Sequence, residues 1–308
     1  MAETVVLTTG LSKWFGQIIA LNDVNVQFRL GITGLLGPNG AGKSTLLRLI
    51  AGQLKPSLGD LSIWGQPVWN NSSLSQRIGF CMDTDGFYWG MTGLELVQFL
   101  ARLSTIPPAE QEVQSLSAIE SVGLTEQMHK KIGAYSKGMR QRLKLAQVLV
   151  HDPDLVLLDE PLNGMDPIGR SETINLIRSL GEKGYCVVVS SHVLHEVESL
   201  TDNILLIHQG NVVAEGRIPD IRDLIDEHPH KIFLHCDNPR LLASICVTFD
   251  DVTGMQVNDK DDSLTIETRR PDEFYDRMPK LVIENKINIY QMYSPDNNLQ
   301  SVFKYLIQ

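Results

Sequence analysis

Few features of this sequence are typical of a secreted, disulfide-bonded or membrane-spanning protein. Four cysteines stand among 308 residues, none of them spaced as C-x-x-C or grouped with histidine at zinc-ligand spacing, so we expect unpaired thiols in a reducing compartment. The N-terminus lacks a basic segment followed by an apolar one, so we predict no secretory signal. The longest apolar runs, such as 155–158 and 186–189, are far shorter than the roughly 20 residues that cross a membrane. We therefore expect a protein that is soluble by itself and cytosolic, and that relies on another chain for any membrane crossing.

Positive charge is also scarce. The chain carries 27 Lys and Arg against 37 Asp and Glu, a net charge of -10. Broad nucleic-acid binding needs a basic face, so this balance argues against it, but it leaves room for a local cationic pocket that binds an anion. The length of 308 residues is enough for one large domain and a smaller one. Hydrophobic residues make up 43% of the sequence, which allows a sizeable core and is unlike a disordered chain.

The order of expected elements changes along the chain. In residues 1–218, early segments with alternating apolar positions predict antiparallel strands, and later buried strands alternate with helices, as in a mainly parallel α/β sheet. Within this part, residues from about 84 to 150 are expected to be mostly helical. Residues 219–308 read as strand, helix, strand, strand, helix, strand, with the two helices expected at 239–249 and 271–285. This order is a ferredoxin-like α+β pattern, and a helix expected at 298–307 closes the chain. We therefore predict two domains, with the boundary after residue 218.

A glycine-rich stretch, GPNGAGKST, matches the pattern G-x-x-x-x-G-K-[S/T] and lies between an apolar strand and an amphipathic helix. Its glycines allow turns that a side chain would block, so that loop N–H groups and the helix N-terminus converge on an anion. Lys43 supplies a charge for the β- and γ-phosphates, and the Ser44 hydroxyl is a ligand for Mg²⁺. The alternative, a chance glycine turn, is disfavoured by the full pattern with its flanking strand. The residues expected to bind a nucleoside triphosphate are Gly37, Pro38, Asn39, Gly40, Ala41, Gly42, Lys43, Ser44 and Thr45.

A pair of carboxylates ends the apolar run LVLLDEP at 155–161. The carboxyl end of a buried strand is where ligands bind in open α/β sheets. Asp159 would orient Mg²⁺ through water, and Glu160 would polarise the water that attacks the terminal phosphate. An acidic pair that caps the next segment is the alternative, and the glycine-rich stretch upstream favours the catalytic interpretation.

These stretches, with three more, resemble the ATPase subunits of ATP-binding cassette (ABC) transporters, which are P-loop NTPases, over roughly residues 1–218. Five motifs in the family's order carry the resemblance: GPNGAGKST at 37–45, YSKGMRQ at 135–141, LVLLDEP at 155–161, NGMD at 163–166 and SSH at 190–192. Together they are far more specific than any one of them. The resemblance implies ATP as the nucleotide, Mg²⁺ as the metal, and two ATP molecules shared between the subunits of a dimer.

The stretch YSKGM lies where the family carries its signature sequence, usually L-S-G-G-Q. Ser136 can cap the helix that follows, leaving free N–H groups and the positive dipole end facing outward. The resemblance implies that the tip formed by Ser136, Lys137 and Gly138 contacts the γ-phosphate of ATP bound to the opposite subunit. An ordinary helix cap with a solvated Lys137 is the alternative.

Three more residues receive roles from the resemblance alone. Phe15 lies where an aromatic ring stacks on adenine, although a core or edge aromatic is an open alternative. Asp166 lies in the loop that communicates between the two sites. His192 lies at the residue that contacts the γ-phosphate and steadies the attacking water, although it could instead cap a strand.

The chain also departs from the family pattern. Asp83 stands where glutamine is usual; it can still hold Mg²⁺, but its charge beside phosphate and Glu160 could slow hydrolysis. Lys137 replaces a glycine and Met139 a glutamine in the signature. The three adjacent aromatics within 86–92 are either an exposed surface that receives a helix of the membrane subunit or packing residues of the helical subdomain.

The sequence thus predicts an ATP-hydrolysing subunit, homodimeric and peripheral at the cytoplasmic face of the cell (inner) membrane, that drives export through a separate permease. The alternatives are a regulator or nucleic-acid- or ribosome-associated ATPase, disfavoured by the acidic charge and the single cassette, and a degenerate cassette that hardly hydrolyses ATP, disfavoured by Glu160 and His192. The C-terminal domain resembles small domains appended to some exporter cassettes, which implies a regulatory or dimer-stabilising role.

Overall fold

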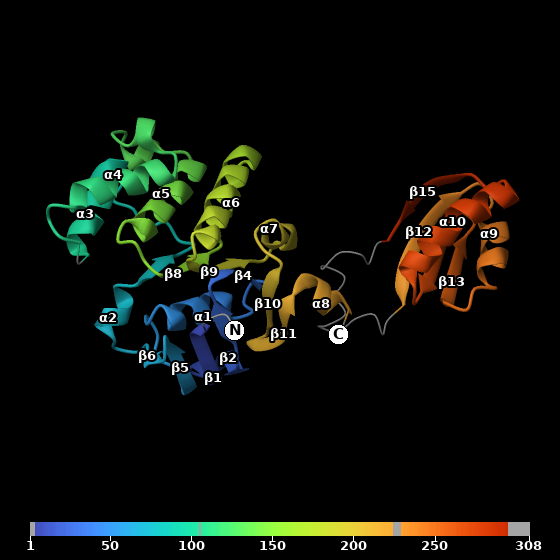
Figure 1. Ribbon diagram of the computed structural model, residues 1–308, viewed down its shortest axis with the longest axis horizontal. Helices are drawn as coiled ribbons and strands as arrows, with labels where there is room; N and C mark the ends of the chain where they lie inside the picture. Colours follow the sequence, from blue (N-terminus) through green and yellow to red (C-terminus); the bar gives the residue numbers. More distant parts are fainter. Residues whose placement is uncertain (1–3, 105, 224–228, 295–308) are drawn as a thin grey trace. The chain divides into compact units, whose positions relative to one another are not determined.

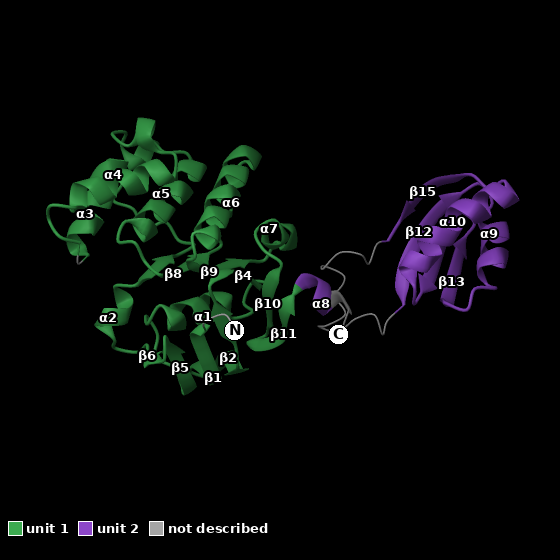
Figure 2. Cartoon of the chain, viewed as in Figure 1, with its two compact units in different colours: residues 1–217 green, residues 218–308 purple. Residues whose placement is uncertain are grey.

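The computed structural model describes residues 4–104, 106–223 and 229–294. The chain divides into two compact units, residues 1–217 and 218–308 (Figure 1 and Figure 2). Each unit is described by itself. The helix expected at 298–307 lies outside the described residues.

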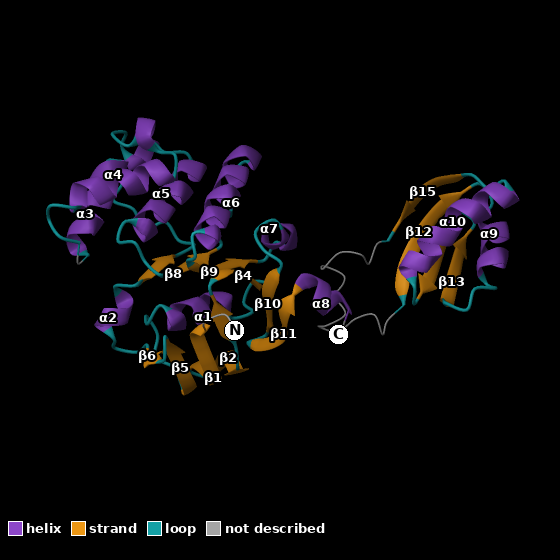
Figure 3. Ribbon diagram, in the orientation of Figure 1, coloured by secondary structure: helices purple, strands orange, loops and turns teal. Residues whose placement is uncertain are grey.

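The first unit contains two sheets (Figure 3). An antiparallel sheet has the strand order β2-β1-β5-β6, with β3 also paired to β1, and a six-stranded sheet has the order β11-β10-β4-β9-β8-β7. In the second sheet all neighbours are parallel except the β10–β11 pair, so the predicted mainly parallel sheet is confirmed. The strands of the antiparallel sheet are β1 (Thr4–Phe15), β2 (Ile18–Val24), β3 (Gln27–Arg29), β5 (Leu58–Ile63) and β6 (Gln66–Pro67). Those of the six-stranded sheet are β4 (Gly31–Leu36), β7 (Ile78–Cys81), β8 (Leu155–Asp159), β9 (Cys186–Ser191), β10 (Asn203–His208) and β11 (Asn211–Arg217).

The central strands of the six-stranded sheet are buried on both faces. Every residue of β8 and β9 is buried, which explains why their sequences are continuous apolar runs rather than alternating ones. Leu155 and Leu157 pack toward α1 (Lys43–Ile50) and the antiparallel sheet, whereas Val156 and Leu158 pack toward the helices on the other face. Figure 1 shows α1 between the two sheets.

The face of the six-stranded sheet opposite α1 is covered by helices, which include the helical region predicted at about 84–150. Its helix α3 begins with a reciprocal capping box between Thr92 and Glu95. The helices of this unit are α2 (Ser72–Ser75), α3 (Gly93–Leu103), α4 (Gln111–Ser121), α5 (Lys137–Leu149), α6 (Pro167–Glu182) and α7 (Leu194–Glu198), with short 3-10 turns η1 (Thr125–Gln127) and η2 (Ile132–Ala134). Among the described residues, no helix is both long enough and apolar enough to cross a membrane.

The second unit has the predicted element order β-α-β-β-α-β. Its antiparallel sheet has the strand order β13-β14-β12-β15, and α9 and α10 pack on the sheet around a core that includes Leu234, Ile266 and Phe274. The elements are α8 (Ile218–Asp223), β12 (His230–Cys236), α9 (Pro239–Cys246), β13 (Val252–Asn258), β14 (Ser263–Thr268), α10 (Pro271–Asn285) and β15 (Ile289–Tyr293).

One predicted helix of this unit is too long. The sequence pattern extends α9 to residue 249, but the helix ends at Cys246. Beyond it, the N–H groups of Thr248 and Phe249 donate to carbonyls three residues back, the tighter pattern that closes a helix end. Phe249 then packs against the core instead of continuing the helix.

The four cysteines lie buried and unpaired, as the sequence predicts. Burial raises the pKa of the Cys81 thiol and of the Cys186 thiol to about 12. Both thiols therefore stay protonated at neutral pH and pack as small apolar side chains.

Candidate nucleotide site

Strand register brings the predicted motifs to one edge of the parallel sheet. Leu36 at the end of β4 pairs with Ser191, and Asp159 at the end of β8 pairs with Ser190. The segments that follow these three strands carry the glycine loop, Glu160 and His192. Because parallel strands end together, side chains separated by more than 100 residues meet at this edge.

The glycine loop spans residues 37–42 between β4 and α1, and Lys43, Ser44 and Thr45 form the first turn of α1. Gly42 has a φ of 110°, and a Cβ there would lie 2.5 Å from the carbonyl oxygen of Ala20, so only glycine fits without strain. No side chain caps the start of α1. Its first N–H groups are therefore available to an anion, together with the positive end of the helix dipole.

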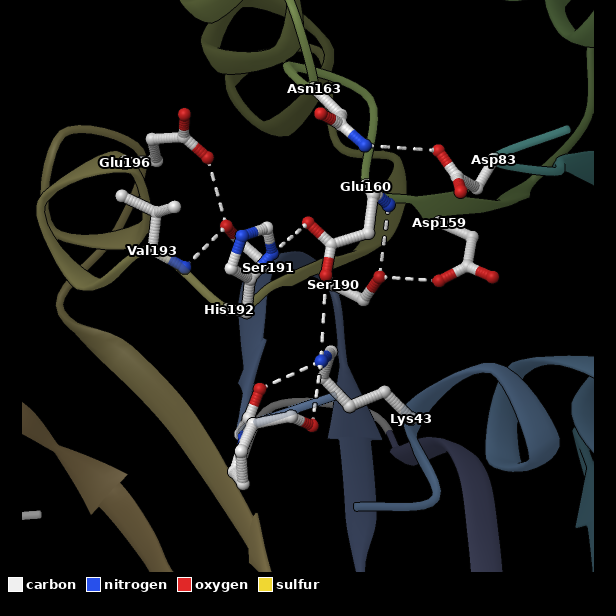
Figure 4. A network of polar contacts seen from close by, with 12 residues as sticks. Lys43, Asp83, Asp159, Glu160, Asn163, Ser190, Ser191, His192, Val193 and Glu196 are labelled. Atoms are coloured by element: carbon white, nitrogen blue, oxygen red, sulfur yellow. Dashed lines mark hydrogen bonds and ion pairs between the residues drawn. The ribbon is translucent and has the colours of Figure 1, made fainter. Parts of the chain in front are cut away.

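Lys43 folds back over this loop (Figure 4). Its Nζ donates to the carbonyl oxygen of Gly37 at 2.7 Å and to that of Pro38 at 3.2 Å. The same nitrogen lies 3.4 Å from Oε1 of Glu160, and both side chains are largely buried. A buried cation thus lies over the loop, where triphosphate oxygens would bind.

Glu160 adopts a left-handed backbone conformation, with a φ of 50°. A non-glycine residue rarely has this conformation, which carries strain unless its surroundings hold it. The Glu160 N–H donates to Ser190 Oγ at 3.0 Å, and that hydroxyl donates to Asp159 Oδ1 at 2.6 Å. Ser190 therefore fixes both carboxylate residues. Its role was missed by sequence reasoning, and the only sequence signal was its place in the SSH motif.

His192 lies against the other side of the Glu160 carboxylate. Its Nδ1 is 2.9 Å from Glu160 Oε2, while Oε1 faces Lys43 (Figure 4). The carboxylate therefore lies between a cation and an imidazole, each contacting a different oxygen. This arrangement suits a group that orients and deprotonates a water molecule beside a phosphate.

The predicted metal ligands fit a nucleotide-bound Mg²⁺ better than a permanent metal centre. Among the residues the structure describes, no group of three or more His, Cys, Asp or Glu side chains could hold a metal ion. Mg²⁺ in nucleotide sites needs one or two carboxylates, with phosphate oxygens and water completing its coordination. Ser44 and Asp159 supply such a set from α1 and the end of β8.

Asp83 lies in an exposed loop after β7. Its Oδ1 accepts a long hydrogen bond, 3.5 Å, from Asn163 Nδ2, and its backbone oxygen accepts one of 2.6 Å from Lys144. Burial alone would raise the pKa of nearby Asp85, but Lys144 and Arg140 outweigh it and hold that pKa below its usual value. Two cations of α5 thus anchor the Asp83 loop to the signature helix.

The aromatic stretch at 86–92 follows the Asp83 loop. Part of it is exposed, as a contact surface would be, and part of it packs in the core of the helical region. Phe87 is buried in the helical core, whereas Tyr88 and Trp89 are more than half exposed. The Arg140 guanidinium lies 5.7 Å from the Trp89 ring centre. An exposed surface and a packing residue therefore occur side by side.

The signature residues form a separate group at the start of α5. Ser136 caps the helix by accepting from the Met139 N–H at 3.2 Å. A Cβ on Gly138 would lie 3.7 Å from Asp166 Oδ2, and a Cβ on Gly164 would overlap Lys137 Nζ. The Lys137 side chain thus lies directly over the backbone of Gly164, a contact that the sequence did not reveal.

No hydrogen bond or ion pair between described residues joins the signature group, Ser136 to Gly138, to the glycine loop. Asp166 instead caps α6, accepting from the N–H groups of Ile168 and Gly169. Phe15 is 47% exposed near the tip of the β1–β2 hairpin, and Lys13 Nζ lies 5.2 Å from its ring centre. Phe15 is therefore no core residue, and its face is accessible.

Comparison with known proteins gives a consistent picture. The model of the ABC transporter family matches residues 21–163. The bacitracin transport ATP-binding protein BcrA of Bacillus licheniformis is 33% identical over 310 residues, which cover 99% of this chain and 98% of that protein. The protein of the same name from Enterococcus faecalis is 38% identical over 222 residues, 71% of each chain.

Solved structures agree at the level of the first unit. One, the ATP-binding subunit of an ABC transporter, has a TM-score of 0.66 and 26% identity, and covers 72% of this chain and 93% of its own. Another, a dimeric ATP-binding cassette with ADP and phosphate bound, has a TM-score of 0.63 and 24% identity, over 69% of this chain and 98% of its own. The second is similar in fold alone.

Proposed function

Because the chain belongs to the ATP-binding subunits of ABC transporters, we propose that it powers export through a separate transmembrane permease, as a homodimer with two ATP molecules at its interface. As a member of this family it binds ATP and hydrolyses it to ADP and phosphate, and the family couples that hydrolysis to transport. The proposed location is peripheral, at the cytoplasmic face of the cell membrane. Full-length similarity to a bacitracin transport subunit makes peptide export the first cargo class to test.

One observation carries the proposed catalytic roles: the Glu160 carboxylate lies between Lys43 and His192 beside the glycine loop. When ATP binds, its phosphates compete with the carbonyls of Gly37 and Pro38 for the Lys43 cation. Glu160 then accepts the proton of the attacking water, while His192 holds the carboxylate from its other side. Ser44 and Asp159, with Asp83 nearby, would hold Mg²⁺, which would supply positive charge against the phosphates.

The proposed dimer follows from the separation of the two groups within one chain. Ser136, Lys137 and Gly138 present a capped helix start with a cation, and in the described part of the chain no hydrogen bond or ion pair joins them to their own glycine loop. A head-to-tail pair would let this helix start bind the γ-phosphate at the partner's loop, since helix N-termini and cations both bind anions. Phe15, with its exposed ring, would stack on the adenine.

Contact with the permease is proposed at the exposed aromatics Tyr88 and Trp89, next to the loop of Asp83. Lys144 and Arg140 of the signature helix hold that loop through Asp85, so a movement of the permease would reach the nucleotide site directly. The second unit is proposed to regulate or stabilise the dimer, which removal of residues 219–308 would test.

Replacement of Glu160 by glutamine tests this proposal. The variant keeps the shape of the side chain but cannot accept the proton, so phosphate release should fall at least about 100-fold. ATP binding should persist, and with Mg-ATP the stalled protein should run as a dimer in size exclusion with light scattering. The control is Asp154→Asn, which alters an exposed ion pair with Arg77 outside the nucleotide site. Normal turnover would refute the role of Glu160, and a stalled protein that stays monomeric would refute the shared site.

A further inference from the structure

Glu196 is a buried carboxylate that the hydrolysis mechanism above does not use. It lies in the first turn of α7, and its side chain is only 6% exposed. An isolated buried carboxylate is costly, so its partners reveal what holds it there. Its two oxygens contact two different elements, Ser191 at the end of β9 and Arg170 in α6.

The contact with Ser191 fixes the backbone around His192. The Ser191 hydroxyl donates to Glu196 Oε2 at 2.8 Å, and Ser191 Oγ accepts a hydrogen bond from the Val193 N–H at 3.0 Å (Figure 4). Because the hydroxyl proton is committed to Glu196, the lone pairs of Ser191 are free for Val193. The residues on both sides of His192 are therefore held by one hydroxyl whose orientation depends on Glu196.

The contact with Arg170 joins this loop to α6. Arg170 Nε lies 3.5 Å from Glu196 Oε1, too far and too poorly aligned for a strong hydrogen bond, so the interaction acts mainly through charge. The backbone N–H of Arg170 donates to the carbonyl of Asp166 at 2.9 Å, which places Arg170 one turn after the start of α6. Asp166 in turn lies beside Gly138 of the signature helix.

We propose that Glu196 is a positioning residue: it ties the Ser191–Val193 turn to the first turn of α6 and thereby holds His192 against Glu160. The proposal deepens the proposed function, because it rests on His192 and Glu160 acting in hydrolysis. The Glu196 side chain contacts Ser191 and Arg170 rather than His192 or Glu160. Its effect on turnover passes entirely through the position of the His192 ring, 2.9 Å from the Glu160 carboxylate.

A double-mutant cycle tests this route. Residues that act as one unit give non-additive losses, whereas independent residues give losses that multiply. Glu196→Ala should lower kcat about 10- to 100-fold, the effect of a small misplacement of a reacting group, with little change in KM for ATP. His192→Ala should lower it at least as much, and the double variant should match His192→Ala within about twofold.

Conservative variants separate the two contacts of Glu196. Glu196→Gln retains an oxygen that can accept from Ser191 but loses the charge beside Arg170, so it should recover only part of the turnover lost in Glu196→Ala. Asp154→Asn, with its exposed ion pair to Arg77, is the matched control and should behave as wild type. If Glu196→Ala does not fold, as thermal unfolding would show, Ser191→Ala replaces it in the same cycle.

The outcomes distinguish this proposal from the proposed function. Near-normal turnover in Glu196→Ala, or losses that multiply in the double variant, would overturn the positioning role while His192 keeps its own. Full turnover in His192→Ala would overturn both. A loss shared with His192→Ala and recovered only in part by Glu196→Gln supports the link from α6 to the histidine, whereas full recovery by Glu196→Gln would overturn that link.

Discussion

Lys43 should stabilise the protein before any nucleotide arrives. In the free chain its ammonium group donates to the carbonyls of Gly37 and Pro38 and lies 3.4 Å from Glu160. Lys43→Met keeps the apolar stem but removes these contacts. The Gly37 carbonyl is buried and loses its donor, while that of Pro38 is partly exposed and can bind water.

The expected loss in free energy of unfolding follows from the two carbonyl groups of Gly37 and Pro38. A hydrogen bond to a charged group contributes about 1.5 to 3 kcal/mol, and an unpaired buried partner adds to the loss. The variant no longer has the cost of burying a cation, which offsets part of this loss. We therefore expect a net loss of about 2 to 4 kcal/mol in the free energy of unfolding. For a unit of 217 residues, each 1 kcal/mol corresponds to roughly 2 to 4 °C in Tm, which gives a decrease of roughly 4 to 16 °C.

Calorimetry of the nucleotide-free protein measures this decrease. The two units can melt separately, so the shift must be assigned to the transition that ATP raises in the wild type. Lys130→Met, at an exposed lysine, is the control. Adding Glu160→Gln to Lys43→Met should restore about 1 kcal/mol, because the carboxylate that lost its cation is also removed. An unchanged melting temperature in Lys43→Met would refute the stabilising role.

Two further predictions concern the second unit. Asp251 accepts from Thr268 Oγ1 and pairs with Arg277 at 2.8 Å; its burial would raise its pKa, but these partners outweigh burial and hold the pKa below its ordinary value. The stabilisation is therefore present above the unfolded pKa and is lost as pH falls through the lower folded pKa. Asp251→Asn should weaken hydrogen-exchange protection of α10 by about 1 to 2 kcal/mol at pH 7, and the difference should shrink as pH falls through the lowered folded pKa of Asp251; a difference that does not shrink on acidification would contradict the charge argument. Deleting residues 219–308 should change ATP-dependent dimerisation or basal ATPase activity, measured by light scattering and phosphate release; no change in either would remove the regulatory proposal.

Local patterns were enough to predict most elements of the fold. The sequence predicts helix α10 over residues 271–285 despite an internal proline, and the structure contains that helix. Proline in a helix costs about 3 kcal/mol, so packing must outweigh it. Phe274, Met278 and Leu281 follow the helical period and all lie buried in the core of the unit, which supplies that packing.

Contacts that depend on tertiary register could not be predicted. Ser190 reaches both Asp159 and the Glu160 N–H only because β8 and β9 pair in one particular register, and no local pattern fixes the register of parallel strands. The passage of Lys137 across Gly164 likewise depends on how α5 packs near the loop before α6. The aromatic stretch at 86–92 lies in a loop without periodicity, so its sequence could not show which ring is buried.

The two carboxylate oxygens of Glu160 have different partners and therefore different proposed roles. Oε2 is held by His192, whose loop is anchored through Ser191 and Glu196, while Oε1 faces a cation that also binds two loop carbonyls. Phosphate oxygens carry full negative charge and compete with those neutral carbonyls for Lys43. Once the cation turns to the phosphates, Oε1 loses its partner while Oε2 keeps its own. In the proposed mechanism the carboxylate would then stay in place with one oxygen available to water, so the same contacts that stabilise the site would prepare Glu160 to act as the base.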